Sequence, residues 1–103
     1  MTVGALEGKI ALVTGAGRGI GAAIACGLAR AGARVVVSDL IRDNAETTAA
    51  SMRDEGLEAW GEALDVRDRA AIDSFARHVA SRYGTISILV NNAGIGGAAR
   101  LGD

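Results

Sequence analysis

The sequence predicts an α/β domain built on a doubly wound parallel sheet. Short aliphatic runs alternate with segments of helical periodicity, and half of the 103 residues are apolar although only three are aromatic. Strands that alternate with helices of this length require a parallel sheet with right-handed crossovers and helices on both faces. The abundant Ala, Val, Ile and Leu suit this packing. We expect one domain over residues 1–103, with no internal boundary.

The first strand and helix are expected within residues 9–31. Residues 9–13 contain the apolar run IALV, which predicts a buried strand. The glycine-rich loop VTGAGRGIG, residues 13–21, overlaps the end of this run. Apolar residues then recur at helical spacing from Ile20 to Ala31, and Gly32 ends the helix.

Three more strands and two more helices follow by the same criteria. β-branched or aliphatic runs mark the strands, and glycines end both helices. The expected strands are residues 34–39, 58–66 and 86–90, and the expected helices run from Ile41 to Gly56 and from Ile72 to Gly84.

The position of the fourth strand predicts an incomplete fold. A doubly wound sheet usually has about five to seven strands. Here residues 91–103 form a loop of small residues at the place where another helix would begin. We therefore expect the chain to be truncated at its C-terminus, with residues 86–90 as an apolar edge. Because an uncovered edge strand tends to pair with another chain, we also expect a homo-oligomer.

Composition excludes several classes of partner. With 11 basic and 12 acidic residues and no block of like charge, nucleic acid and membrane surfaces are not expected partners. No run approaches the roughly 18 apolar residues that span a bilayer, and the first residues do not resemble a signal peptide. The single cysteine, Cys26, agrees with a cytoplasmic location. One histidine, His78, and one cysteine give no support for a metal site.

The glycine loop is the strongest functional signal. One or two glycines would be enough to end a strand and start a helix, but residues 15, 17, 19 and 21 are all glycine. Between the first strand and first helix of a βαβ unit, bare backbone lets a pyrophosphate approach the unpaired N–H groups of the helix N-terminus. We expect this loop to bind a dinucleotide. Gly21, one turn into the helix, is expected to allow close packing of the helix.

An acidic residue at the end of the second strand predicts which dinucleotide binds. Asp39 lies eighteen residues after Gly21, and an acid at about this distance accepts hydrogen bonds from the adenosine ribose. Its charge would repel a 2′-phosphate and favours NAD over NADP. Arg18 and Arg42 leave NADP open as the alternative, because either guanidinium could contact a phosphate.

These motifs together resemble the short-chain dehydrogenase/reductase family over residues 8–95. The glycine spacing and the N-N-A-G motif after the fourth strand make the resemblance specific. One departure is Ser87, where many members carry aspartate. The motifs are T-G-x-x-x-G-x-G at Thr14, Gly15, Gly19 and Gly21, the acid Asp39, the pair Asp65-Val66, and N-N-A-G at Asn91, Asn92, Ala93 and Gly94.

The resemblance implies a Rossmann-type fold and a set of cofactor contacts. The pyrophosphate and nearby ribose would be lined by Gly15, Arg18, Gly19 and Ile20, with Gly21 behind them. The adenosine ribose would lie between Asp39 and Leu40, and the adenine would meet Asp65 and Val66. The end of the fourth strand would contribute Asn91, Ala93 and Gly94, whereas Asn92 would brace neighbouring strands.

The resemblance also implies hydride transfer between a nicotinamide cofactor and an alcohol or carbonyl substrate. The family uses a Tyr, a Lys four residues later, a Ser and an Asn. Here the only lysine is Lys9 and the only tyrosine is Tyr83, so no catalytic residue is assigned and the chain alone is expected to be inactive. The alternative function is a truncated, non-catalytic dinucleotide-binding module that oligomerises. We expect Tyr83 and Trp60 to pack in the interior or at its boundary, and His78 and Glu62 to be solvated.

Overall fold

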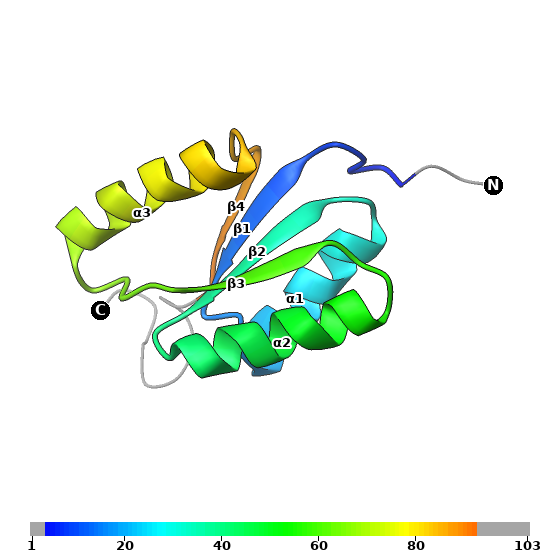
Figure 1. Cartoon of the computed structure of the whole chain (residues 1–103), viewed down its shortest axis with the longest axis horizontal. Helices are drawn as coiled ribbons and strands as arrows, with labels where there is room; N and C mark the ends of the chain where they lie inside the picture. Colours follow the sequence, from blue (N-terminus) through cyan, green and yellow to red (C-terminus); the bar gives the residue numbers. More distant parts are fainter. Residues whose placement is uncertain (1–3, 93–103) are drawn as a thin grey trace.

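The computed structural model describes residues 4–92 and has the predicted order of elements (Figure 1). All strand pairs are parallel, in the order β3-β2-β1-β4. The doubly wound α/β class is therefore confirmed. The elements are β1 Ile10–Thr14, α1 Gly19–Arg30, β2 Arg34–Asp39, α2 Arg42–Asp54, β3 Ala59–Ala63, α3 Arg69–Tyr83 and β4 Ile88–Asn91.

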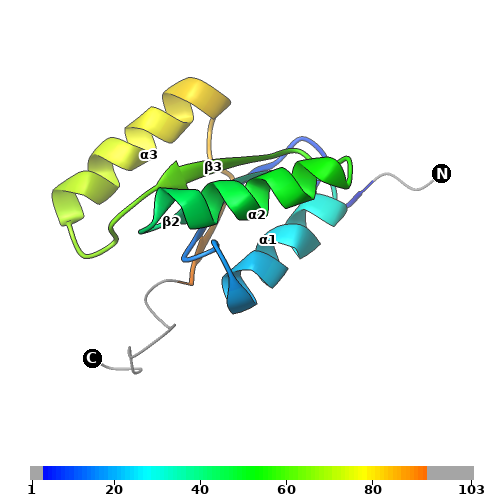
Figure 2. The same ribbon diagram turned by 60° about the horizontal axis from the view of Figure 1, so that its bottom comes forward.

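Helices cover both faces of the sheet. α1 and α2 lie on one face and α3 lies on the other (Figures 1 and 2). Successive residues of a strand point to opposite faces, so β2 sends Val35 and Val37 into the core under α1 and α2 and Val36 into the core under α3. In the core under α1 and α2, most of the buried helix residues are alanines, and their small side chains let the two helices lie close to the strands.

The predicted ends of β1 are off by one residue, and those of β3 and β4 differ more. β3 was expected over residues 58–66 but ends at Ala63, which pairs with Asp39, the last residue of β2. The chain after Ala63 does not continue as a strand, because β2 has already ended and offers no partner there. β4 was expected over residues 86–90 but covers Ile88 to Asn91, because its register follows β1 from Ala11 to Thr14.

Helix α3 begins three residues before the first apolar position that predicted it. The Asp68 side chain caps the helix by accepting the N–H of Ala71 at 3.1 Å, a typical N-cap bond. Of the helices within residues 4–92, none is long and apolar enough to cross a membrane.

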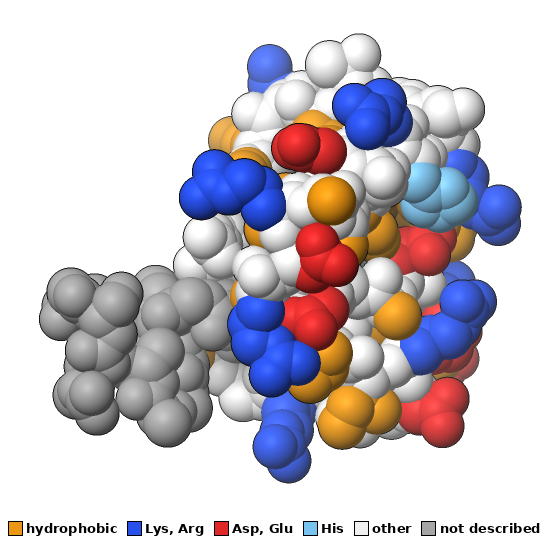
Figure 3. Space-filling view, turned by 90° about the vertical axis from the view of Figure 1, so that its left-hand side faces the viewer, with side chains coloured by type: hydrophobic (Ala, Val, Ile, Leu, Met, Phe, Trp, Pro, Cys, Tyr) orange, Lys and Arg blue, Asp and Glu red, His pale blue; other side chains and the backbone are white. Residues whose placement is uncertain are grey.

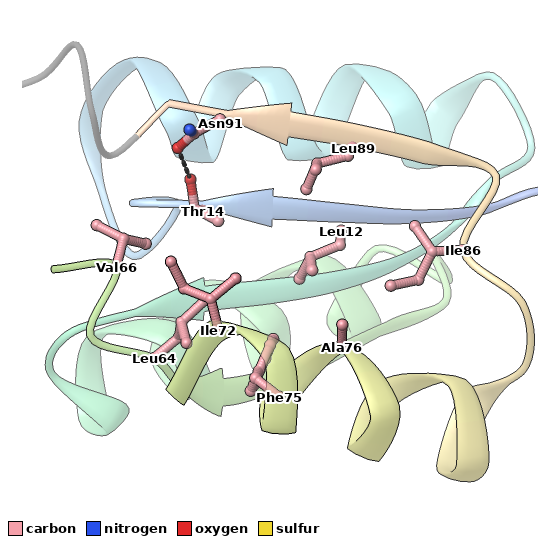
Figure 4. A pocket seen from close by; sticks show the side chains of 10 residues that line it. All are labelled: Leu12, Thr14, Leu64, Val66, Ile72, Phe75, Ala76, Ile86, Leu89 and Asn91. Carbon is pink, nitrogen blue, oxygen red and sulfur yellow. Dashed lines mark hydrogen bonds between the residues drawn. The ribbon is translucent and has the colours of Figure 1, made fainter. Parts of the chain in front are cut away.

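The face of the sheet under α3 is only partly covered. A groove of about 430 Å³ lies between α3 and the strands β1 and β4. We call it the α3 groove. Figure 4 shows the side chains that line it. Leu89 of β4 lies at its margin and is 65% exposed. The lining residues are Leu12, Thr14, Leu64, Val66, Ile72, Phe75, Ala76, Ile86, Leu89 and Asn91.

Candidate dinucleotide site

The glycine loop connects the carboxyl end of β1 to the first turn of α1. Gly15 and Gly19 have φ angles of 60° and 66°, in the left-handed region that glycine adopts without steric penalty. Two positions of the loop therefore require glycine for the backbone conformation alone. Both lie at the places where the sequence motif predicts them.

Gly21 is required for a different reason, which is space. A Cβ atom on Gly21 would lie 2.3 Å from the Gly15 carbonyl oxygen and 2.6 Å from Nδ2 of Asn92. The close packing predicted for Gly21 is confirmed, and the groups that approach it are the glycine loop and Asn92. The first turn of α1 is thereby held against the end of β1.

The solvent side of the same loop has room for a ligand. A Cβ on Gly19 would meet no atom within 4 Å. Arg18, the N-cap residue of α1, makes no side-chain capping bond, and the first N–H groups of a helix have no partner within the helix. Open space beside such an N-terminus, which carries a partial positive charge, fits a pyrophosphate. Ile20, in the first turn, is 74% exposed.

The structure brings Asp39 against the glycine loop, as the strand order predicts. One carboxylate oxygen accepts the Gly17 N–H at 3.1 Å and the other accepts the Ile41 N–H at 3.0 Å. Two backbone bonds therefore hold the carboxylate in place, and a carboxylate has acceptor sites left for further hydroxyl groups. Leu40, the next residue, is 57% exposed.

Three further side chains or backbone groups support the loop. The Ala16 N–H donates to the Ser38 carbonyl at 2.8 Å, and the Thr48 hydroxyl donates to the Gly17 carbonyl at 2.7 Å. Asn92 donates through Nδ2 to the Gly15 carbonyl at 3.1 Å. Asn92 therefore has a structural contact, but its partner is the glycine loop and not a neighbouring strand as predicted. The contributions of Ser38 and Thr48 were not predicted, because no motif distinguishes these residues from other polar ones.

The residues expected near the adenine follow β3. The Asp65 carboxylate accepts three hydrogen bonds from Arg67: one from its backbone N–H and one from its Nε at 2.9 Å each, and one from its terminal NH2 at 3.0 Å. These bonds from the Arg67 side chain and backbone lower the pKa of Asp65 to about 2. Asp65 therefore stays ionised well below neutral pH. The pairing of Asp65 with Arg67 was not predicted from the sequence.

At the end of β4, Asn91 lies beside Thr14 of β1. Its Oδ1 accepts the Thr14 hydroxyl at 3.1 Å (Figure 4). These two residues and Val66 lie at the same end of the α3 groove. The structure thus brings three predicted segments together at one edge of the sheet: the glycine loop, the end of β2 and the end of β4. Ala93 and Gly94 lie outside the described residues.

One expectation about solvated residues was wrong. The Glu62 side chain is only 15% exposed and accepts the Tyr83 hydroxyl at 2.5 Å, with His78 Nε2 at 3.4 Å from the same oxygen. Burial first, and then the bond to Glu62, raise the pKa of Tyr83. The Tyr83 ring lies 5.1 Å from that of Trp60, so both aromatic residues pack as predicted. His78, with its side chain 49% exposed, is on the surface as expected.

The surface beside these elements carries mixed side chains. Figure 3 views the molecule from the side where α3 begins and shows basic, acidic and hydrophobic groups interspersed. This agrees with the net charge of −1.

The parallel sheet with its glycine loop and strand-end acid defines a Rossmann-type α/β domain. The sequence model of one protein family, described as short chain dehydrogenase, matches residues 9–103. The chain belongs to this family, which implies a nicotinamide cofactor. Because the open face of Gly19 adjoins the uncapped start of α1, the residues present fit the pyrophosphate of such a cofactor.

Known proteins similar to this chain include several dehydrogenases. A D-threitol dehydrogenase of Mycolicibacterium smegmatis is 48% identical over 90 residues, which are 87% of this chain and 35% of the relative. A sorbitol dehydrogenase of Cereibacter sphaeroides is 47% identical over 90 residues, 87% of this chain and 34% of the relative. The crystal structure of a hydroxysteroid dehydrogenase from Escherichia coli matches with a TM-score of 0.80 at 40% identity, over 84% of this chain and 37% of that one. The chain therefore spans about a third of the length of these relatives.

Proposed function

We propose that this chain is the NAD-binding part of an oxidoreductase that transfers hydride between NAD and an alcohol or carbonyl substrate. The observation that carries the proposal is the junction of the glycine loop with Asp39. The start of α1, with open space at Gly19, would receive the pyrophosphate, and the Asp39 carboxylate would receive the ribose. The two are close because Asp39 is hydrogen-bonded to Gly17, two residues before Gly19. The unpaired Cys26 supports the cytoplasm as the compartment.

Each part of the cofactor has proposed partners in the chain. The loop and the first turn of α1 bind the pyrophosphate, and the residues after β2 and β3 bind the adenosine. The nicotinamide cofactor supplies hydride transfer when bound. The proposed contacts are Gly15, Arg18, Gly19, Ile20 and Gly21 for the pyrophosphate side, Asp39 and Leu40 for the ribose, Asp65 and Val66 for the adenine, and Asn91, Ala93 and Gly94 beyond them.

The fixed position of Asp39 supports NAD over NADP. A mobile carboxylate could turn away from a 2′-phosphate, but this one is held by the N–H groups of Gly17 and Ile41. A phosphate at the ribose 2′ position would therefore meet a carboxylate that cannot turn away from it. Leu40, next to it, offers no compensating positive charge.

Calorimetric titration with NAD and NADP tests the choice of cofactor. We expect the natural chain to bind NAD more tightly, and the double substitution Asp39→Ser and Leu40→Arg to shift the preference toward NADP. The matched control is Asp43→Ser, which removes an exposed acid four residues further on, in the first turn of α2. An unchanged preference in the double variant, or an equal shift in the control, would show that Asp39 does not face the ribose.

The exposed apolar edge supports a second candidate function, a non-catalytic dinucleotide-binding module that pairs with another copy. Leu89 is 65% exposed on β4, beside the apolar α3 groove. The Tyr83 hydroxyl is bonded to Glu62, and no Tyr-x-x-x-Lys occurs among the 103 residues. Sedimentation velocity combined with a dehydrogenase assay separates the two functions. Turnover by the purified chain would exclude the module, and a monomer at all concentrations would exclude the pairing.

A further inference from the structure

The peptide groups on either side of Gly17 are held by two different elements. Its N–H donates to Asp39 at the end of β2, at 3.1 Å, and its carbonyl accepts the hydroxyl of Thr48 in α2, at 2.7 Å. α2 also lies close to the loop here, since a Cβ on Gly17 would lie 2.7 Å from the Cβ of Asn44. Thr48 is half-buried, so its hydroxyl is partly shielded from competing water.

The bond from Thr48 determines how the next peptide group is turned. The C=O and N–H of a trans peptide point in opposite directions, so a Gly17 carbonyl that faces Thr48 directs the Arg18 N–H away from α2. Arg18 is the N-cap residue of α1 and lies on the open side of the loop. If this peptide group rotated, a carbonyl oxygen would replace the N–H donor and would repel an anion there. Glycine restrains such a rotation less than any other residue.

We propose that Thr48 is a positioning residue for phosphate binding by the glycine loop. It acts through the Gly17 carbonyl, not by contact with a ligand, and it keeps the Arg18 N–H available as a donor. This inference rests on the proposed function, because it assumes that the loop binds a pyrophosphate. It adds a residue of α2 to a site otherwise assigned to strand ends, loops and the first turn of α1.

The test compares ligands with and without phosphates. ADP contains the pyrophosphate and adenosine lacks it, so a defect in the loop should weaken the binding of ADP alone. Thr48→Val keeps the shape of the side chain and removes the hydroxyl, Thr48→Ser keeps the hydroxyl, and Thr47→Val makes the same change at an exposed neighbour in the same helix. Affinities are measured by calorimetry for ADP and by NMR titration for adenosine.

We expect Thr48→Val to weaken ADP binding by roughly fivefold to tenfold, the loss associated with one hydrogen bond. Adenosine binding should be unchanged, Thr48→Ser should bind ADP within about twofold of the natural chain, and Thr47→Val should bind both ligands normally.

Each other result has a distinct meaning. Equal ADP affinities of the natural chain and Thr48→Val would overturn the positioning role and leave the proposed function intact. Equal losses for ADP and adenosine would make Thr48 a general structural residue and also overturn it. If the natural chain binds no ADP, the proposed function fails and the inference falls with it. Should Thr48→Val lose helical circular dichroism, Thr48→Ala replaces it in the same comparison.

Discussion

Replacing Gly21 by alanine tests the packing that positions the glycine loop. The added Cβ would lie 2.3 Å from the Gly15 carbonyl oxygen and 2.9 Å from the Cα of Ala16, so backbone atoms must move. An ordinary contact needs about 3.5 Å, which requires a displacement of roughly 1 Å. The same methyl group would also lie 2.6 Å from Nδ2 of Asn92, the donor to Gly15.

Three contributions determine the change in the free energy of unfolding. Overpacking of a close contact costs about 1–3 kcal/mol. Loss of the hydrogen bond from Asn92 to Gly15 costs about 0.5–1.5 kcal/mol. Alanine offsets about 0.5–1 kcal/mol of this, because glycine is the poorer helix former. We expect Gly21→Ala to lower the free energy of unfolding by about 2 kcal/mol, the middle of the resulting range.

Urea denaturation measures this change, with the fluorescence of Trp60, the only tryptophan, as the signal. With a denaturant slope of about 2 kcal/mol per molar, the midpoint should fall by about 1 M. Gly27→Ala is the matched control in the same helix, since a Cβ there meets nothing within 4 Å. It should raise the midpoint slightly through helix propensity. If Gly21→Ala were as stable as Gly27→Ala, the close contact at Gly21 would not constrain the fold.

Two pH titrations test the ionisable pairs. Tyr83 is the only tyrosine, so phenolate absorbance reports its pKa alone; the midpoint should lie above 10.0 and move down in Glu62→Gln. Because burial first, and then the bond to Glu62, raise this pKa, the neutral phenol stabilises the fold below pH 10.0, and this contribution is lost as the pH rises through the midpoint. An unperturbed midpoint would contradict the buried contact. For Asp65, carboxyl carbon NMR should give a pKa of about 2 that rises toward 3.8 in Arg67→Gln. The pair therefore contributes above pH 3.8 and is lost as the pH falls through about 2, and an unchanged pKa in the variant would exclude the pairing with Arg67.

Local patterns were sufficient for the order of elements, because each strand and helix carries its own periodicity. The ends were harder to predict, since they depend on neighbours distant in the sequence. Leu64 and Val66 alternate with the charged Asp65 in a pattern that would let a strand continue, but β2 ends at Asp39 and offers no further pairing. Ile86 likewise belongs to an apolar run, yet β4 begins only where its register with β1 allows.

The site could be predicted to the extent that it depends on backbone conformation. Left-handed φ angles at Gly15 and Gly19 demand glycine, and this demand is visible in the sequence. The hydroxyl of Thr48 satisfies a carbonyl 31 residues earlier in the chain, and other polar residues in the same helix are indistinguishable from it by pattern. Glu62 was assigned to solvent because its partner Tyr83 lies 21 residues away, on a different element.

The glycine loop is made of the residues with the greatest conformational freedom, yet three hydrogen bonds from other elements restrain it. Glycines permit the sharp path, but four of them within seven residues would leave a free loop disordered, at a cost in binding affinity. Here the carbonyl of Gly15 accepts a hydrogen bond from Asn92, and the N–H of Gly17 donates one to Asp39. The carbonyl of Gly17 accepts a third from Thr48. These restraints come from the residue after β4, from the end of β2 and from α2, and they hold the loop without any contact from a ligand. The loop conformation that we propose to bind phosphate therefore depends on the packing of the sheet and its helices, and not on the glycine motif alone.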